Sequence, residues 1–151
     1  MKKSNSISLT SILILIFSTI VFGQKNPFQA IPIDRTDGFY VTIDYDSTSP
    51  EKEIELTAQP GLTVKHIKKV KTIISRYTSQ PEIAIRFTKK GSIIFHQLTK
   101  ENIGKPIAIV LDKKIVYLPI VQSEISGGRV VISGDFSIQE IDEMANRLKK
   151  K

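Results

Sequence analysis

The chain has 151 residues, no cysteine, and a net charge of +7 from 22 basic and 15 acidic side chains. This length is enough for the core of one domain, and the absence of cysteine excludes both a disulfide-held fold and a lipid-modified amino terminus of the bacterial lipoprotein kind. The positive charge favours contact with acidic surfaces but is too moderate to indicate a nucleic-acid-binding protein.

The first residues have the pattern of a secretory signal. Two lysines precede an apolar run over residues 12–22, which is shorter than the roughly 20 residues that cross a bilayer. The pattern predicts a signal peptide over residues 1–23, cleaved between Gly23 and Gln24, and therefore an exported protein in the periplasm or outside the cell. An uncleaved membrane anchor is the alternative.

Residues 24–37 contain two prolines and no regular period, which predicts an extended linker ahead of a single domain over residues 38–151. Apolar residues then alternate with polar ones over residues 39–45 and again over residues 51–58. Because turn-forming residues separate these two segments, we expect them to form a β-hairpin.

A helix is predicted over residues 63–77. Ile67, Val70, Ile74 and Tyr77 recur at helical spacing, with lysines on the opposite side. The lysine-bearing side could contact an acidic partner, although a solvated surface is the simpler interpretation.

The second half of the chain carries further strand and helix signals. Residues 82–87 alternate as a strand, residues 88–102 carry a helical apolar stripe, and Gly104 fits the left-handed position that ends a helix. Three apolar runs follow, over residues 107–111, 115–120 and 129–133. The first is predicted to be a buried central strand and the second its antiparallel neighbour.

The predicted fold class is α+β, with one antiparallel β-sheet and about three helices packed mainly on one face as a two-layer sandwich. The last helix is the most clearly marked of the three. Ser137 and Glu140 form a capping box at its start, and Phe136 and Ile141 form a hydrophobic staple.

No residue pattern indicates catalysis. His66 and His96 each lack a second histidine at metal-binding spacing, and Asp44 and Asp46 lack the glycine and the glutamate of a calcium loop. No serine lies in a nucleophile-elbow pattern. The sequence therefore predicts a non-enzymatic protein that holds no metal and no cofactor.

The second half also resembles a known family. From about Leu56 onward the chain is similar to the head subdomain of the first periplasmic domain of SecD, in the SecDF protein-export accessory family. The matching positions are Phe95, Leu98, Thr99, Asn102, Ile103, Gly104, Lys105, residues 108–112, Pro119, Ile125, Gly127, Gly128, Arg129, Ile132, Ser133, Gly134, Phe136 and Ser137. Lys113, Tyr117 and Leu118 depart from the family pattern, and SecD itself has six membrane spans where this sequence offers a single signal-like run.

The resemblance implies a stand-alone exported module that binds polypeptide and assists protein export or folding outside the cytoplasm. The expected contact residues lie on a sheet edge and in the loop after it: Ile115, Tyr117, Ile120, Gln122, Gly127 and Gly128. The alternative is an adaptor or structural protein of the cell envelope that docks on one specific folded partner. Neither a nucleic-acid partner nor a membrane span after signal cleavage is expected, and the oligomeric state stays open.

Overall fold

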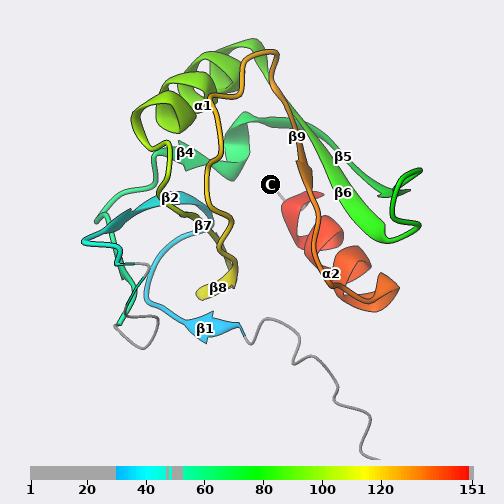
Figure 1. Cartoon of the computed structure of the whole chain (residues 1–151), viewed down its shortest axis with the longest axis horizontal. Helices are drawn as coiled ribbons and strands as arrows, with labels where there is room; N and C mark the ends of the chain where they lie inside the picture. The colour runs from blue at the N-terminus through cyan, green and yellow to red at the C-terminus, as the bar shows by residue number, and fades with distance from the viewer. Residues whose placement is uncertain (1–29, 47, 49–52, 150–151) are drawn as a thin grey trace, which may run out of the picture.

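The computed structural model describes residues 30–46, 48 and 53–149. The predicted signal peptide and the first residues of the predicted linker lie outside these ranges. The described part forms two antiparallel sheets and two α-helices, with the first sheet at the left of Figure 1 and the second at the right. No helix in this part is both long enough and apolar enough to span a bilayer.

The first sheet is built around β7 (Ile107–Leu111), all five residues of which are buried. On either side of β7 lie β2 (Gly38–Ile43) and β8 (Lys114–Tyr117), both antiparallel to it. Three short strands complete the sheet, with β1 (Ile31–Pro32) beside β8, and β3 (Glu55–Leu56) and β4 (Leu62–Thr63) beside β2. These pairings confirm the predicted central strand, its antiparallel neighbour and the hairpin of β2 with β3.

Residues 30–37 belong to the predicted linker, and they lie against this first sheet. Ile31 pairs with Ile115, and the Asp34 carboxylate lies 3.0 Å from the Lys113 ammonium. The hydrogen bond and the positive charge of Lys113 lower the pKa of Asp34 below its ordinary value of 3.8. Both side chains are exposed, so this ion pair contributes little to stability.

The second sheet has the strand order β5 (Ile67–Ile74), β6 (Pro81–Phe87), β9 (Arg129–Ile132). Helix α2 (Ile138–Lys149) packs on one face of it, where Ile141 and Leu148 are fully buried. The prediction of a single sheet was wrong. Strand β9 follows β8 in the chain, but residues 118–128 carry it across to the second sheet, where Val130 pairs with Ile85.

The prediction of a helix over residues 63–77 was also wrong. The described part therefore has two α-helices, whereas about three were expected. The segment forms the end of β4, a 3-10 turn (Val64–His66) and then β5. A β-bulge between Ile67 and Lys69 explains the error. The extra residue keeps Ile67 and Val70 both on the buried face although they are three positions apart, which imitates helical spacing.

The other two predicted helices are confirmed, with their caps. Helix α1 (Lys89–Glu101) begins after Thr88, whose hydroxyl accepts a hydrogen bond from the Gly91 N–H at 3.1 Å, and it is followed by Gly104 at a φ of +81°. At the start of α2 the Ser137 hydroxyl accepts from the Glu140 N–H at 3.2 Å, and the Glu140 carboxylate accepts from the Ser137 N–H at 2.8 Å. The Glu140 carboxylate also accepts from the Ser137 hydroxyl at 2.8 Å, and the hydrogen bonds that it accepts from the Ser137 N–H and hydroxyl lower the pKa of Glu140.

Candidate functional site: a pocket between the two sheets

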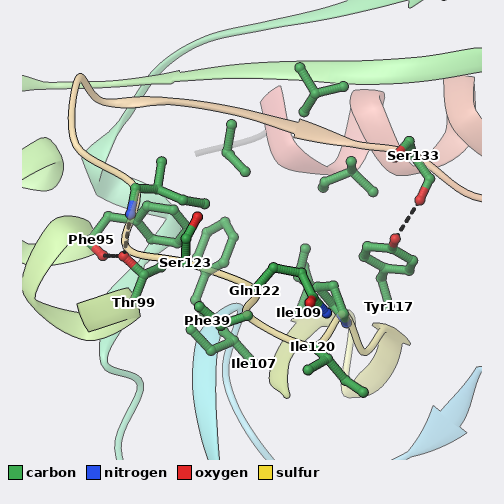
Figure 2. A pocket seen from close by; sticks show the side chains of 16 residues that line it. Phe39, Phe95, Thr99, Ile107, Ile109, Tyr117, Ile120, Gln122, Ser123 and Ser133 are labelled. Atoms are coloured by element: carbon green, nitrogen blue, oxygen red, sulfur yellow. Dashed lines mark hydrogen bonds between the residues drawn. The ribbon is translucent and has the colours of Figure 1, made fainter. Parts of the chain in front are cut away.

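A pocket of about 350 Å³ lies where the chain crosses from the first sheet to the second. Its apolar wall is made by Phe39 of β2, Phe95 of α1, and Ile107 and Ile109 of β7. Strand β9 forms the opposite wall, and residues 119–123 and Ile125 of the crossing segment form the rim (Figure 2). A volume of this size lies within the range of small-ligand and side-chain pockets, roughly 300–1,000 Å³.

Three aromatic rings fix the apolar wall. The ring centroids of Phe39 and Phe95 lie 5.8 Å apart, and those of Phe39 and Phe87 lie 5.7 Å apart, both in edge-on geometry. Phe87 and Phe95 approach to 4.7 Å. Because these rings come from β2, β6 and α1, the wall of the pocket is continuous with the main hydrophobic core and is held rigid by it.

A hydrogen bond closes each end of the pocket, as Figure 2 shows. At one end the Thr99 hydroxyl donates to the Phe95 carbonyl at 2.9 Å and accepts from the Ile125 N–H at 2.9 Å. At the other end the Tyr117 hydroxyl donates to the Ser133 carbonyl. The bond between Ile125 and Thr99 connects the crossing segment to α1, and the bond between Tyr117 and Ser133 connects β8 to β9. The pocket therefore has defined ends.

The crossing segment has a second attachment to α1. His96 Nε2 lies 3.3 Å from a carboxylate oxygen of Glu124, a distance that allows an ion pair when the imidazole is protonated. Both side chains are partly exposed. The rim of the pocket therefore contacts α1 at two points.

The edge of β9 that faces the pocket carries backbone groups that β6 does not use. The Phe87 N–H donates to the Gly128 carbonyl at 2.9 Å, which sets the phase of the β6–β9 ladder. In an antiparallel ladder only every second residue of a strand hydrogen-bonds to a given neighbour. The backbone groups of Val130 and Ile132 therefore bond to β6, and the N–H and carbonyl of Val131 point away from β6. Val131 lines the pocket, so it presents one backbone donor and one acceptor there.

Three of the six contact residues expected from the sequence meet at this pocket: Tyr117, Ile120 and Gln122. Ile115 is fully buried within the first sheet, so its side chain does not reach the surface. Gly127 and Gly128 lie in the crossing segment outside the pocket lining. Gly128 has a φ of +63°, and a Cβ atom there would lie 2.6 Å from the Ser92 hydroxyl, so it serves the turn.

The residue pattern alone does not reveal the pocket walls. Phe39, Phe95, Ile107 and Ile109 come from segments far apart in the chain, and each has the pattern of an ordinary core residue. The pairing of β9 with β6 is what brings Val131 opposite them. The one local signal was the family resemblance, because Phe95 and Thr99 both lie on its matching positions.

The described residues contain no group of three or more histidine, aspartate or glutamate side chains placed to hold a metal ion. Of the two histidines considered from the sequence, His96 lies beside Glu124, and His66 Nδ1 lies 3.1 Å from the Thr63 hydroxyl.

The stability of the protein is expected to depend on pH through the Tyr117 hydroxyl. Burial raises the pKa of Tyr117 above its ordinary value of 10.0, because the ionised ring is poorly solvated there. The contribution of this group to stability is therefore complete below pH 10 and is lost as pH rises through the higher folded-state pKa. We expect Tyr117→Phe to lower the free energy of unfolding by about 1 kcal/mol near neutral pH, because the hydrogen bond is lost. Above about pH 10 the difference in the free energy of unfolding between the variant and the parent chain should shrink.

Urea unfolding on both sides of pH 10 checks this expectation. Tyr77→Phe is the matched control, because Tyr77 is 99% exposed and its removal should leave stability unchanged at either pH. A gap between the parent and Tyr117→Phe that stays constant with pH would contradict the assignment.

The chain is similar in sequence to proteins whose names place them in protein translocation. The model of the family described as "SecDF, P1 head subdomain" matches residues 40–150. The chain is 36% identical over 127 residues to the protein translocase subunit SecD of Calditerrivibrio nitroreducens, covering 83% of this chain and 22% of the relative. With the SecDF of Thermus thermophilus it shares 34% identity over 86 residues, 57% of this chain and 12% of the relative.

Solved structures agree. A structure described as a membrane component SecDF that enhances protein export superposes with a TM-score of 0.61 at 25% identity, over 74% of this chain and 60% of that chain. The SecDF of Thermus thermophilus, described as a translocon-associated membrane protein, gives 0.54 at 30% identity, over 69% of this chain and 15% of that one. The chain spans about a fifth or less of the length of the curated relatives named here. Because the family match extends over most of the described domain, the chain belongs to the SecDF P1 head subdomain family.

Proposed function

We propose that this chain is an exported module that binds an extended segment of polypeptide in the pocket between its two sheets, and thereby assists protein export or folding outside the cytoplasm. The relatives are named as translocase subunits, and the amino-terminal pattern predicts export. The observation that carries the proposal is an apolar pocket that lies directly beside an unpaired strand edge.

The edge of β9 suits strand addition. A bound segment would exchange backbone hydrogen bonds with the N–H and carbonyl of Val131, and its alternate side chains would point into the apolar wall. Recognition through the backbone requires no particular sequence, which suits a module that meets many unfolded chains. The exposed rim residue Ile120, 44% exposed, supplies apolar contact at the pocket entrance.

The test uses a fluorescently labelled peptide of about ten residues with alternating valine and serine, and its binding is followed by anisotropy. Two further peptides carry N-methyl groups on every second residue, one on the odd and one on the even positions. If the peptide adds as a strand at one edge, only alternate N–H groups point to the protein, so one methylated peptide should lose binding and the other should keep it. Equal effects in both registers, or no binding by the parent peptide, would contradict the proposal.

A pair of variants localises the binding. Ile120→Asp places a charge at the pocket rim and should weaken binding by about tenfold or more, equivalent to about 1.4 kcal/mol. Ile103→Asp makes the same chemical change at a side chain that is 54% exposed and outside the pocket lining, and should leave binding unchanged. If the peptide does not bind while one stoichiometric folded partner co-purifies from the envelope, the chain is the adaptor considered from the sequence.

A further inference from the structure

The outer face of the second sheet is the face turned away from α2 and the core. Side chains of β5, β6 and β9 alternate between the two faces, and those at positions 83, 85 and 132 point inward and are buried. The outward-pointing side chains, which are exposed or half-buried, are Lys69, Lys71, Ile73, Glu82, Ala84, Arg86, Arg129 and Val131. We call this set the outer face. The pocket proposed to bind polypeptide lies at the edge of β9 and shares only Val131 with the outer face.

Three cations form a row across the outer face. Lys69 pairs with Arg86 on the neighbouring strand, and Arg86 pairs in turn with Arg129. All three side chains are exposed. Like charges directly opposite each other destabilise a sheet, so this arrangement is unfavourable for folding alone. A ligand of opposite charge would relieve the repulsion.

The described residues supply no acidic partner for this row. Within residues 30–46, 48 and 53–149, the ion pairs found involve other cations: His96, Lys113 and Arg147. One carboxylate, that of Glu82, lies on the outer face, but its cross-strand partner is Ile73. Lys71 adds a fourth cation next to the row, so the outer face has a net positive charge.

Apolar side chains extend the same surface toward the tip of the β5–β6 hairpin. Val131, 49% exposed, and Ile73, 36% exposed, lie on the outer face, and Tyr77 at the hairpin tip is 99% exposed. The hairpin tip reaches the margin of the molecule, at the right of Figure 1. At a strand rise of about 3.3 Å per residue, Ile73 lies about 13 Å from Lys69, so cations and apolar groups share one footprint.

Cations beside exposed aromatic and aliphatic side chains match the chemistry of an anionic bilayer surface. The headgroup phosphates attract lysine and arginine, and the interfacial region accommodates tyrosine and isoleucine. A folded acidic protein would satisfy the row of cations, but it would need a concave site shaped to receive the projecting tip. A bilayer requires no such complementarity.

We propose that the outer face and the tip of the β5–β6 hairpin bind the surface of a bilayer that contains anionic phospholipids. Bound in this way, the domain rests on the membrane through β5, β6 and β9. The pocket edge of β9 then lies beside the membrane surface. This inference stands apart from polypeptide binding, because the two surfaces share no side chain that the tests change.

The first experiment reports insertion at the hairpin tip. The chain has no cysteine, so Tyr77→Cys gives a unique site for an environment-sensitive NBD label on the full chain. Vesicles that contain phosphatidylglycerol are expected to blue-shift and brighten the label, whereas phosphatidylcholine vesicles leave it unchanged. Ile93→Cys, labelled in the same way on exposed α1, is the control and should not respond to either vesicle. Because the label reports its own surroundings, binding through residues 1–29 would not reproduce this pattern.

The second experiment tests the cationic row with the Tyr77 label in place. Arg86→Gln with Arg129→Gln should weaken the response to phosphatidylglycerol vesicles by about 25-fold, at roughly fivefold per cation near an anionic surface. Lys100→Gln with Lys105→Gln removes the same charge elsewhere and should change the response by less than about twofold. Equal weakening by both pairs, or an unresponsive label at position 77, would overturn the proposal. Binding of polyglutamate through the row without any response to vesicles would replace it with an acidic protein partner.

Discussion

Replacing Phe95 by alanine is expected to lower the free energy of unfolding by about 3–5 kcal/mol, the usual cost of emptying an aromatic core position. Phe95 is buried, with only 4% of its surface exposed, and it contacts the rings of Phe39 and Phe87. The change removes apolar burial and both ring contacts, and it leaves a cavity that joins the pocket. Chemical denaturation of the two proteins measures the difference.

A neighbouring residue on the same helix gives the control. Ile93 is 66% exposed, so Ile93→Ala should change the free energy of unfolding by no more than about 0.5 kcal/mol. A loss below about 1 kcal/mol for Phe95→Ala would mean that α1 and the two sheets do not share one core. The same result would remove the rigid wall on which the proposed polypeptide site depends.

Elements specified by local patterns could be predicted from the sequence. The buried run at residues 107–111 was recognisable because it is apolar on both faces, and the start of α2 because Ser137 and Glu140 cap each other. Both signals lie within a few residues of the element that they define. Because the surrounding fold does not alter these signals, the two predictions were confirmed.

The segment at residues 63–77 shows where local patterns are misleading. The bulge at Ile67 and Lys69 breaks the two-residue alternation that marks a strand. What remained was an apolar spacing of three and four, which is typical of a helix. The run of β-branched residues at Val70, Thr72, Ile73 and Ile74 was the contrary signal, because such side chains favour strands.

The pocket could not be predicted because its existence depends on which sheet β9 joins. A hairpin of β8 with β9 is the simpler expectation from the sequence, since consecutive strands usually pair. Pairing of β9 with β6 instead leaves a gap between the sheets, bounded by Tyr117 and Ser133 at one end and by Thr99 and Ile125 at the other. Nothing in the short-range pattern distinguishes the two pairings, although two of the expected contact residues that line the pocket, Ile120 and Gln122, lie on the segment that makes the crossing.

Gly91→Ala is expected to destabilise the chain by about 1–3 kcal/mol, although alanine is the better helix former by about 1 kcal/mol. A Cβ atom on Gly91 would lie 2.7 Å from the Cβ and 2.8 Å from the carbonyl oxygen of His66. That carbonyl accepts the Thr88 N–H at 2.8 Å, so it cannot move without weakening the junction between β4, β5 and the start of α1. Steric overlap with fixed backbone therefore outweighs helix propensity.

Two further variants separate overlap from propensity. Lys90→Ala changes an exposed neighbour on α1 and should be nearly neutral. Gly61→Ala makes a shorter contact, 2.5 Å, but with the end of the Leu98 side chain, which can rotate, so its cost should be smaller than that of Gly91→Ala. Urea unfolding of the three variants gives the ranking. A Gly91→Ala protein as stable as its parent would show that the contact between α1 and His66 is looser than the structure has it, and the wall of the pocket that α1 carries would be loose with it.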